Sequence, residues 1–273
     1  MSIRETFRYQ GLDAVRVGRF NTGVNTTFVV YRLNGTVIDT GPSNQWRYVK
    51  PFIQSVPLNQ LLLTHHHEDH SGNAGAIQKL TGVQALAPEL TIGILKKGFR
   101  IPPIQKLFWG TAGKAEVAPL PEELSIDGEK VVPLFSPGHA KDMTCYLLPE
   151  RGWLFSADLY IANYLKLLRI DEDVPTLLNS IKGVLYHSFD VILCPHRGVV
   201  EKGWQQLNTK YEFLLNLSGE AQELQKSGLS LNEITLQLLG EEGLISKLTG
   251  YNLCKRNLIA SSLKVDLSQM PSL

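Results

Sequence analysis

The chain has 273 residues, of which 43% are hydrophobic and 19% are charged, and its formal net charge is +1. This length allows one large domain with its own core, or one domain with a small appendage. The near-neutral charge lacks the basic excess of a dedicated nucleic-acid binder, which weakens the case for a nucleic-acid partner without removing it.

The cysteines and the N-terminus indicate a compartment. Cys145, Cys194 and Cys254 are odd in number and far apart, which argues against a disulfide framework. The first residues, from Met1 to Thr6, carry charges where a secretory peptide has an apolar core, and no run approaches the length of a membrane span. We therefore expect a cytoplasmic protein without a membrane partner.

The first elements predicted along the chain are strands. Residues 14–20 and 26–33 have strand character, and the Asn34-Gly35 dipeptide between the second run and residues 36–40 is a strong hairpin signal. Asp39 lies at the end of the third strand. It is either a turn-forming residue or an outer-shell group that orients a metal-bound histidine.

A cluster of histidines and carboxylates follows the next predicted strand. A helix is expected at residues 46–53, and the apolar run Leu61 to Thr64 indicates a buried strand. Side chains two positions apart on an extended backbone point to the same side, so His65 and His67 should face together. Asp69 and His70 then come where a helix begins. Such a packed cluster would be partly unpaired without a cation, so the segment predicts a metal site.

The residues Thr64 to His70 match the motif T-H-x-H-x-D-H, and on that motif the chain resembles the metallo-β-lactamase-fold hydrolases. The triple-histidine form, His65-His66-His67, is most similar to glyoxalase II. The resemblance covers roughly the first 200 residues. It implies an α/β fold, namely an αβ/βα sandwich of two mixed β-sheets flanked by helices.

The resemblance also implies a ligand set. In that family two further histidines and an aspartate come from later loops, each after a strand-like run, and His139, Asp158 and His196 are the candidates here. The implied ligands of the first cation are His65, His67 and His139, those of the second are Asp69, His70 and His196, and Asp158 bridges the two. His66 should face away from the cluster, and His187, in an apolar helix-like stretch, should be structural.

The ligand types favour zinc, two ions per chain, although iron and manganese accept similar sets. Two such cations can share a water, lower its pKa and polarise a substrate oxygen, so that no serine or cysteine nucleophile is needed. Through the resemblance, Asp69 is also assigned a catalytic role, and the second interpretation of Asp39 is preferred.

Two residues are candidates for substrate binding. Tyr160 directly follows the Asp158 loop, and Arg197 adjoins His196, where a guanidinium can bind a carboxylate or phosphate. Residues 88–121 carry lysines, arginine and aromatics, and are either a flap for an anionic substrate or a helix and loop that cover the core. The expected partner is therefore a small anionic molecule. Residues 160–169 are equally open to fold or homodimer contacts.

After His196 the sequence becomes helical. Helices are predicted at residues 204–225, at 230–239 behind a capping box that begins at Ser230, and at 253–265. We therefore divide the chain into a catalytic domain, residues 1–200, and a C-terminal helical extension, residues 201–273. The extension is either a winged-helix-like tail or a cap that packs on the sandwich, and the striped helices favour the cap.

Three functions from different classes remain. The first is hydrolysis of a thioester or ester by a hydroxide that two metal ions activate, as in hydroxyacylglutathione hydrolase. The second is a phosphodiesterase or ribonuclease of the β-lactamase-like branch, suggested by the helical tail and by its lysines, Lys202, Lys210, Lys226, Lys247, Lys255 and Lys264. A solvated face is the preferred interpretation of these lysines. The third is a non-catalytic metal-binding scaffold, which is disfavoured because every ligand position is filled.

Overall fold

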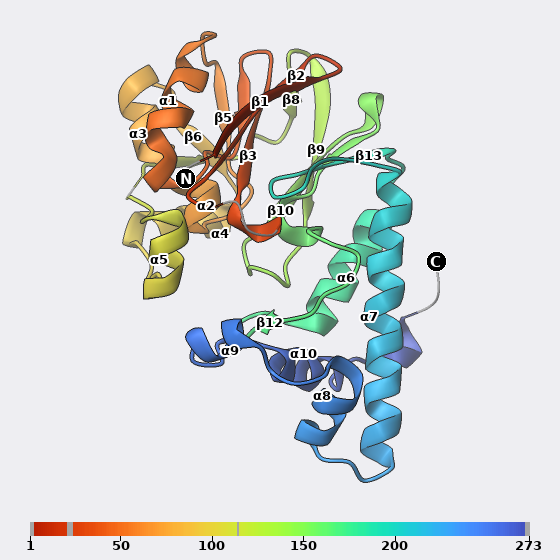
Figure 1. Cartoon of the computed structure of the whole chain (residues 1–273). Helices are drawn as coiled ribbons and strands as arrows, with labels where there is room; N and C mark the ends of the chain where they lie inside the picture. The colour runs from red at the N-terminus through yellow and green to blue at the C-terminus, as the bar shows by residue number, and fades with distance from the viewer. Residues whose placement is uncertain (1–2, 21–23, 114, 271–273) are drawn as a thin grey trace.

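The computed structural model describes residues 3–20, 24–113 and 115–270. Within them, two β-sheets lie face to face between layers of helices, and the helices of the C-terminal part extend away from one end of the sandwich (Figure 1). The predicted αβ/βα sandwich with a helical C-terminal extension is confirmed.

The first sheet is seven-stranded, in the order β1-β2-β3-β4-β5-β6-β7. Its first four strands are antiparallel neighbours, and β4 to β7 are parallel. The strands are β1 (Ile3–Tyr9), β2 (Leu12–Gly18), β3 (Phe28–Leu33), β4 (Thr36–Ile38), β5 (Gln60–Leu62), β6 (Ala85–Ala87) and β7 (Val117–Pro119). The hairpin predicted at Asn34-Gly35 joins β3 to β4. Strand β1 was not predicted.

The second sheet is six-stranded, in the order β14-β13-β11-β10-β9-β8. Its strands are β8 (Leu124–Ile126), β9 (Glu129–Phe135), β10 (Thr144–Leu148), β11 (Trp153–Phe155), β13 (Val191–Cys194) and β14 (Gly198–Glu201). A separate two-stranded ribbon pairs β12 (Leu168–Arg169) with β15 (Leu253–Cys254).

Helices cover both outer faces. The helices of the first half are α1 (Trp46–Gln54), α2 (Glu68–Ser71), α3 (Ala74–Thr81), α4 (Glu89–Lys97) and α5 (Pro103–Trp109). Those of the second half are α6 (Val174–Leu185), α7 (Gly203–Lys226), α8 (Leu231–Leu239), α9 (Leu244–Leu248) and α10 (Lys255–Ser262). Short 3-10 turns lie at Val24–Thr26, Ser43–Gln45, Pro149–Arg151, Ala157–Leu159 and Leu267–Gln269. The capping box predicted at Ser230 is present at the start of α8.

The alternation of side chains along the strands produces the layers. On β2, Val15 and Val17 face the cluster shared with α1 and α3, whereas Ala14 faces the cluster between the sheets. On β10, Tyr146 belongs to the cluster between the sheets, and Cys145 belongs to the cluster shared with α6 and α7. These two central strands therefore bury both faces, as a four-layer sandwich requires.

The C-terminal helices share a core with the second sheet. Leu207 and Tyr211 of α7 and Leu258 of α10 lie in the same apolar cluster as Leu178 of α6 and Ile192 of β13. This packing is that of a cap on the sandwich. The division of the chain at residue 200 stays a prediction.

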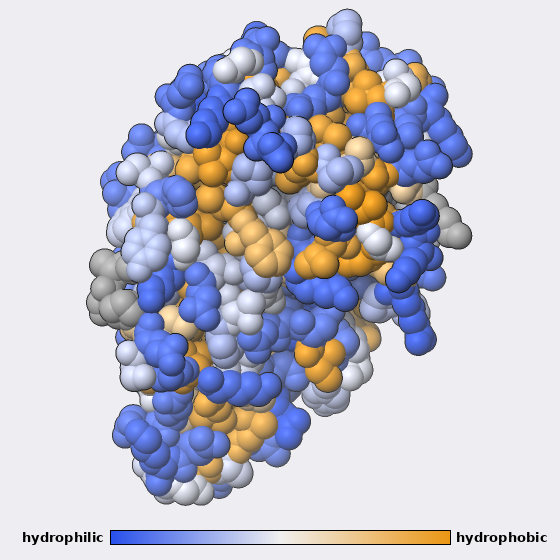
Figure 2. All heavy atoms as spheres, turned by 180° about the vertical axis from the view of Figure 1, so that it is seen from behind, coloured by the Kyte–Doolittle hydropathy of each residue, from blue (hydrophilic) through white to orange (hydrophobic). Residues whose placement is uncertain are grey.

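The surface opposite to the view of Figure 1 is mostly hydrophilic, with apolar residues in separate patches (Figure 2). Large apolar side chains remain exposed near the end of the extension, among them Leu244, Leu248 and Tyr251. In the described part of the chain, no helix combines the length and the apolar character needed to cross a membrane.

Candidate metal centre

The first site residues lie on the loop that follows β5, at the carboxyl edge of the parallel strands. Asp39, just after β4, accepts hydrogen bonds from the Thr64 backbone N–H and the Thr64 hydroxyl, both at 2.8 Å. This pairing fixes the chain where β5 ends. His65 is fully buried, His67 is 7% exposed, and Asp69 and His70 belong to the single turn of α2.

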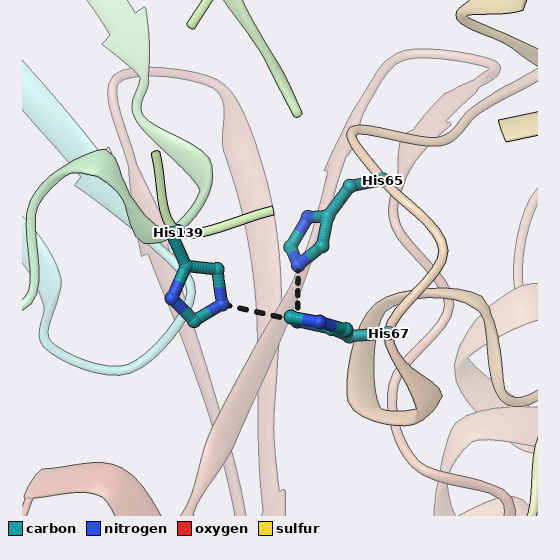
Figure 3. Close-up of side chains that lie close together, drawn as sticks. All are labelled: His65, His67 and His139. Carbon is teal, nitrogen blue, oxygen red and sulfur yellow. Dashed lines mark hydrogen bonds between the residues drawn. The ribbon is translucent and has the colours of Figure 1, made fainter. Parts of the chain in front are cut away.

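Three histidine rings converge on one point. His65 Nε2 lies 2.9 Å from His67 Nδ1, and His139 Nε2 lies 3.0 Å from the same atom. Figure 3 shows the three rings pointing at one another, with His139 on a loop across from the His65–His67 segment. A neutral imidazole has one donor and one acceptor nitrogen, so three nitrogens crowded together are best satisfied by a cation.

The loop that carries His139 depends on a glycine. Gly138 has φ +131°, and a Cβ at this position would lie 2.6 Å from the Leu177 Cα of α6. The Gly138 carbonyl accepts a hydrogen bond from the Asp173 N–H at the start of α6. Because only glycine tolerates both the backbone conformation and the close approach, it sets how near His139 comes to the helix.

A second group of ligand-type atoms lies beside the first. Asp69, His70 and His196 each offer one atom, and these atoms are within 4.8 Å of one another. His196 Nε2 is 3.5 Å from Asp69 Oδ2. The ring of Phe28 packs edge-on against His70 and His196, at centroid distances of 4.8 and 5.6 Å. An apolar wall therefore limits how these rings can turn.

Asp158, in the Ala157–Leu159 turn, lies between the two groups. Its Oδ2 is 3.1 Å from His139 Nε2, and its Oδ1 is 3.4 Å from His70 Nε2 and 3.3 Å from His196 Nε2. Despite these short distances, His70 Nε2 and Asp158 Oδ1 are buried without a hydrogen bond. Buried polar atoms are rarely left unpaired, so this pair fits a cation held between them.

The opposite nitrogens of four of these histidines contact acceptors. His70 Nδ1 is 2.7 Å from Asp39 Oδ2, and His139 Nδ1 is 2.6 Å from Glu172 Oε1. His196 Nδ1 is 2.9 Å from the Thr27 carbonyl, and His65 Nδ1 is 3.1 Å from the Thr64 hydroxyl. Such partners fix the ring of a metal-binding histidine and the tautomer that presents a lone pair to the ion. The interpretation of Asp39 as an outer-shell group agrees with this contact.

Burial and neighbouring charges shift the pKa values of the site residues in both directions. Burial, together with the neighbouring His70, holds the pKa of His65 well below its usual value, and burial with the neighbouring His65 does the same to His67. Burial alone would raise the pKa of Asp158, but His196, His139 and His70 outweigh it and hold that pKa well below normal. Burial opposes the charge on His139 as well, yet Asp158 and Glu172 raise its pKa to about 9. A cation must therefore displace a proton from His139.

The seven predicted ligand residues thus lie together, and their donor types and unpaired atoms fit metal binding. His66 faces away, as predicted: its Nδ1 lies 2.7 Å from Asp142 Oδ1, and its ring packs on Phe99. His187 follows α6 and is half-buried, outside the cluster.

The predicted substrate-binding residues lie near the site. Tyr160 is 2% exposed, and its hydroxyl donates to Asn163 Oδ1 at 2.6 Å. Arg197 is exposed beside the buried His196. Their roles stay predictions. In the segment 88–121, Trp109 packs on His196 at 5.9 Å, so part of this segment does border the site, while Lys114 lies outside the described residues.

Several supporting residues were not predicted. Asp142 also accepts a hydrogen bond from the buried Thr91 hydroxyl, Glu172 holds His139, and Arg169 lies 3.5 Å from His67. Lys210 of α7, 3% exposed, donates to the Leu159 carbonyl at 2.7 Å, directly beside Asp158. The one signal for Lys210 in the sequence was its position, three residues after Leu207 and four before Leu214 of the apolar helix stripe.

Residues 20–193 match the model of the metallo-beta-lactamase superfamily. The chain is 25% identical over 203 residues to the lactamase-like protein nscB of Arthroderma benhamiae, a match that covers 69% of this chain and 42% of that protein. It is 30% identical over 105 residues to a hydroxyacylglutathione hydrolase of Maricaulis maris, covering 38% of this chain and 35% of that protein. An atrochrysone carboxyl ACP thioesterase of Passalora fulva is 23% identical over 240 residues, covering 82% of this chain and 66% of that protein.

Among solved structures, a metallo-beta-lactamase family protein of Thermus thermophilus superposes with a TM-score of 0.64 at 18% identity. The superposition covers 93% of this chain and 91% of that protein. At this identity the likeness concerns the fold.

Proposed function

This chain belongs to the metallo-β-lactamase superfamily, and from that membership we propose that it is a hydrolase dependent on two divalent cations, zinc by preference, that cleaves a thioester or ester of a small anionic molecule. The observation that carries the proposal is the placement of Asp158. One of its carboxylate oxygens faces His139 of the first group, and the other faces His70 and His196 of the second.

The residues of the site have separate roles in this proposal. One cation would be held by His65, His67 and His139, and the other by Asp69, His70 and His196. Asp158 would contact both cations. When bound, two such cations lower the pKa of a water and polarise a carbonyl oxygen. Asp69, 7% exposed beside His196, is our candidate for the group that accepts the proton from the attacking water. Asp39 and Glu172 keep His70 and His139 in the orientation that binding needs.

The preference for a thioester rests on the relatives. Two of the matched proteins are named as a hydroxyacylglutathione hydrolase and an acyl-carrier-protein thioesterase, and both names denote hydrolysis of a thioester. The chain spans 35% and 66% of the length of these two relatives, and what their names share is the thioester bond.

The test combines metal analysis with a substrate panel. We expect about two equivalents of metal per chain, a higher kcat/KM on acyl thioesters than on phosphodiesters, loss of activity with a chelator and recovery with zinc. His139→Ala should lower the metal content, whereas His187→Ala, a histidine outside the cluster, should keep it. Faster cleavage of phosphodiesters would favour the ribonuclease function, and full metal content without any hydrolysis would favour the scaffold.

A further inference from the structure

The ribbon of β12 and β15 brings a guanidinium to the metal centre. Arg169 of β12 pairs with Leu253 of β15, in the C-terminal extension, and the adjacent Ile170 N–H donates to the Asn252 carbonyl at 2.8 Å. The Asp171 carboxylate accepts hydrogen bonds from Arg169 Nε at 3.0 Å and from Nη2 at 2.8 Å. Two of the three guanidinium nitrogens are thereby engaged, and the third, Nη1, lies 3.5 Å from His67 Nε2.

This contact differs from those of the other four histidines. Their opposite nitrogens meet a carboxylate, a carbonyl or a hydroxyl, whereas His67 Nε2 meets a group that can only donate. The His67 Nδ1 atom is the one that converges with His65 and His139. When Nδ1 gives its lone pair to a cation, Nε2 carries the hydrogen, and two donors then face each other.

Two donors 3.5 Å apart cannot satisfy each other, but one acceptor can satisfy both. An oxygen can lie about 2.9 Å from both nitrogens at once, which is an ordinary hydrogen-bond distance for each of them. Both donors are shielded, since the Arg169 side chain is 19% exposed and His67 is 7% exposed. An anionic oxygen there would gain charge-assisted hydrogen bonds beside the centre at which a substrate must bind.

We propose that Arg169 Nη1 and His67 Nε2 form an oxyanion-binding subsite next to the metal centre, which takes a carboxylate or phosphate oxygen of the substrate. The subsite rests on the proposed function in one respect, because it needs a cation on His67 Nδ1. It also gives the C-terminal extension a role, because β15 holds the strand that positions Arg169.

The competing explanation is that Arg169 only shapes its own turn through the ion pair with Asp171. The two explanations predict opposite results for Asp171→Asn. If the ion pair is merely structural, substitution of Arg169 and substitution of Asp171 should have the same effect on anion binding. If Arg169 binds an anion, the Asp171 carboxylate competes with that anion for the guanidinium. Removal of the Asp171 charge should then leave anion affinity unchanged or increase it.

The experiment measures the binding of inorganic phosphate and, separately, of acetate to the zinc-loaded full chain by calorimetry. Arg169→Gln should weaken binding of at least one probe by about tenfold, and the probe that loses more identifies the class of anion. Asp171→Asn should weaken neither. Arg8→Gln, which removes an exposed arginine of β1, is the matched control and should equal the wild type.

Zinc content and thermal unfolding of each variant are measured first. If Arg169→Gln does not fold, Arg169→Lys replaces it, and it should retain part of the affinity through its charge. An affinity unchanged in the Arg169 variant would place the anion on the metals alone and overturn the proposal, as would equal losses in the Arg169 and Asp171 variants. No turnover is measured, so failure of the hydrolase proposal would be seen separately, in the substrate panel.

Discussion

The ligand-type residues of this protein fall into two regions that are built in different ways. His65, His67, Asp69 and His70 come from one six-residue segment after β5, and the carboxylate of Asp39 fixes both the segment and the His70 ring. The second region consists of His139, Asp158 and His196, each on its own loop. Each loop has a support far away in the sequence, namely Glu172, Lys210 and the Thr27 carbonyl.

This difference indicates which substitutions should disturb folding and which should disturb metal binding. The first region keeps its geometry as long as the parallel strands β4 and β5 stay paired. The second region is correct only if separate elements dock correctly, because Glu172 directly precedes α6, Lys210 lies on α7, and Thr27 directly precedes β3 of the first sheet. We therefore expect substitutions in the first region to affect folding and metal binding together, and substitutions of the remote supports to affect metal binding with little change in folding.

Asp158→Ala should have the largest effect, since it removes the residue that joins the two regions. Its carboxylate contacts histidines of both groups, so affinity for at least one metal should fall by more than the roughly 100-fold upper range of an outer-shell change. Turnover of every substrate class should fall with it. Elemental analysis and kcat/KM measure the two effects. Two tightly held metals with near-normal turnover would show that Asp158 does not bridge.

Asp39→Ala should come next, and it tests the first region. The change leaves three buried donors without an acceptor, on Thr64 and His70. We expect the free energy of unfolding to fall by about 2–4 kcal/mol, along with metal affinity. Asp39→Asn keeps one acceptor oxygen and tolerates the positive φ of 56°, so it should lie between the wild type and Asp39→Ala. Denaturant unfolding would contradict the prediction if both variants were as stable as the wild type.

Glu172→Gln should have a smaller effect, confined to metal binding. The glutamate contacts His139 Nδ1 at 2.6 Å and its side chain is 11% exposed, so solvent compensates little for its loss. We expect roughly tenfold weaker binding of metal with a nearly unchanged unfolding transition. Equal losses of stability in Glu172→Gln and Asp39→Ala would remove the distinction between the two regions.

The same division explains what could be predicted from the sequence. The first region followed from residue spacing alone, because its members share one strand end and one helix turn. His139, Asp158 and His196 followed from the family resemblance together with the strand-like runs before them. Arg169 and Glu172 could not be found, because the ribbon of β12 and β15 consists of two-residue strands, too short for any periodic pattern. Lys210 was assigned to a solvated helix face, and only the docking of α7 shows that it is buried.

At neutral pH, Lys210→Met should have the smallest effect of these substitutions on stability and metal affinity. Its effect on the free energy of unfolding should grow as the pH rises. Burial lowers the pKa of Lys210 from its usual 10.5 to about 8. Between these values the unfolded chain binds more protons at this residue than the folded chain does, so the contribution of Lys210 to stability rises with pH, by at most roughly 1.4 kcal/mol for each pH unit. Methionine has no such proton, so the stability of the wild type relative to the variant should increase from pH 8 to about 10.5.

Denaturant unfolding at several pH values measures this difference, with Lys79→Met, an exposed lysine of α3, as the control for loss of a lysine. Removing the hydrogen bond to the Leu159 carbonyl should also loosen the turn that carries Asp158, so metal affinity should weaken by a small factor, well below that of Glu172→Gln. A stability difference that stayed constant across this pH range would mean that Lys210 is not buried as a support of the second region. The Asp158 loop would then have to be held by contacts within the sandwich, and the second region would be as self-contained as the first.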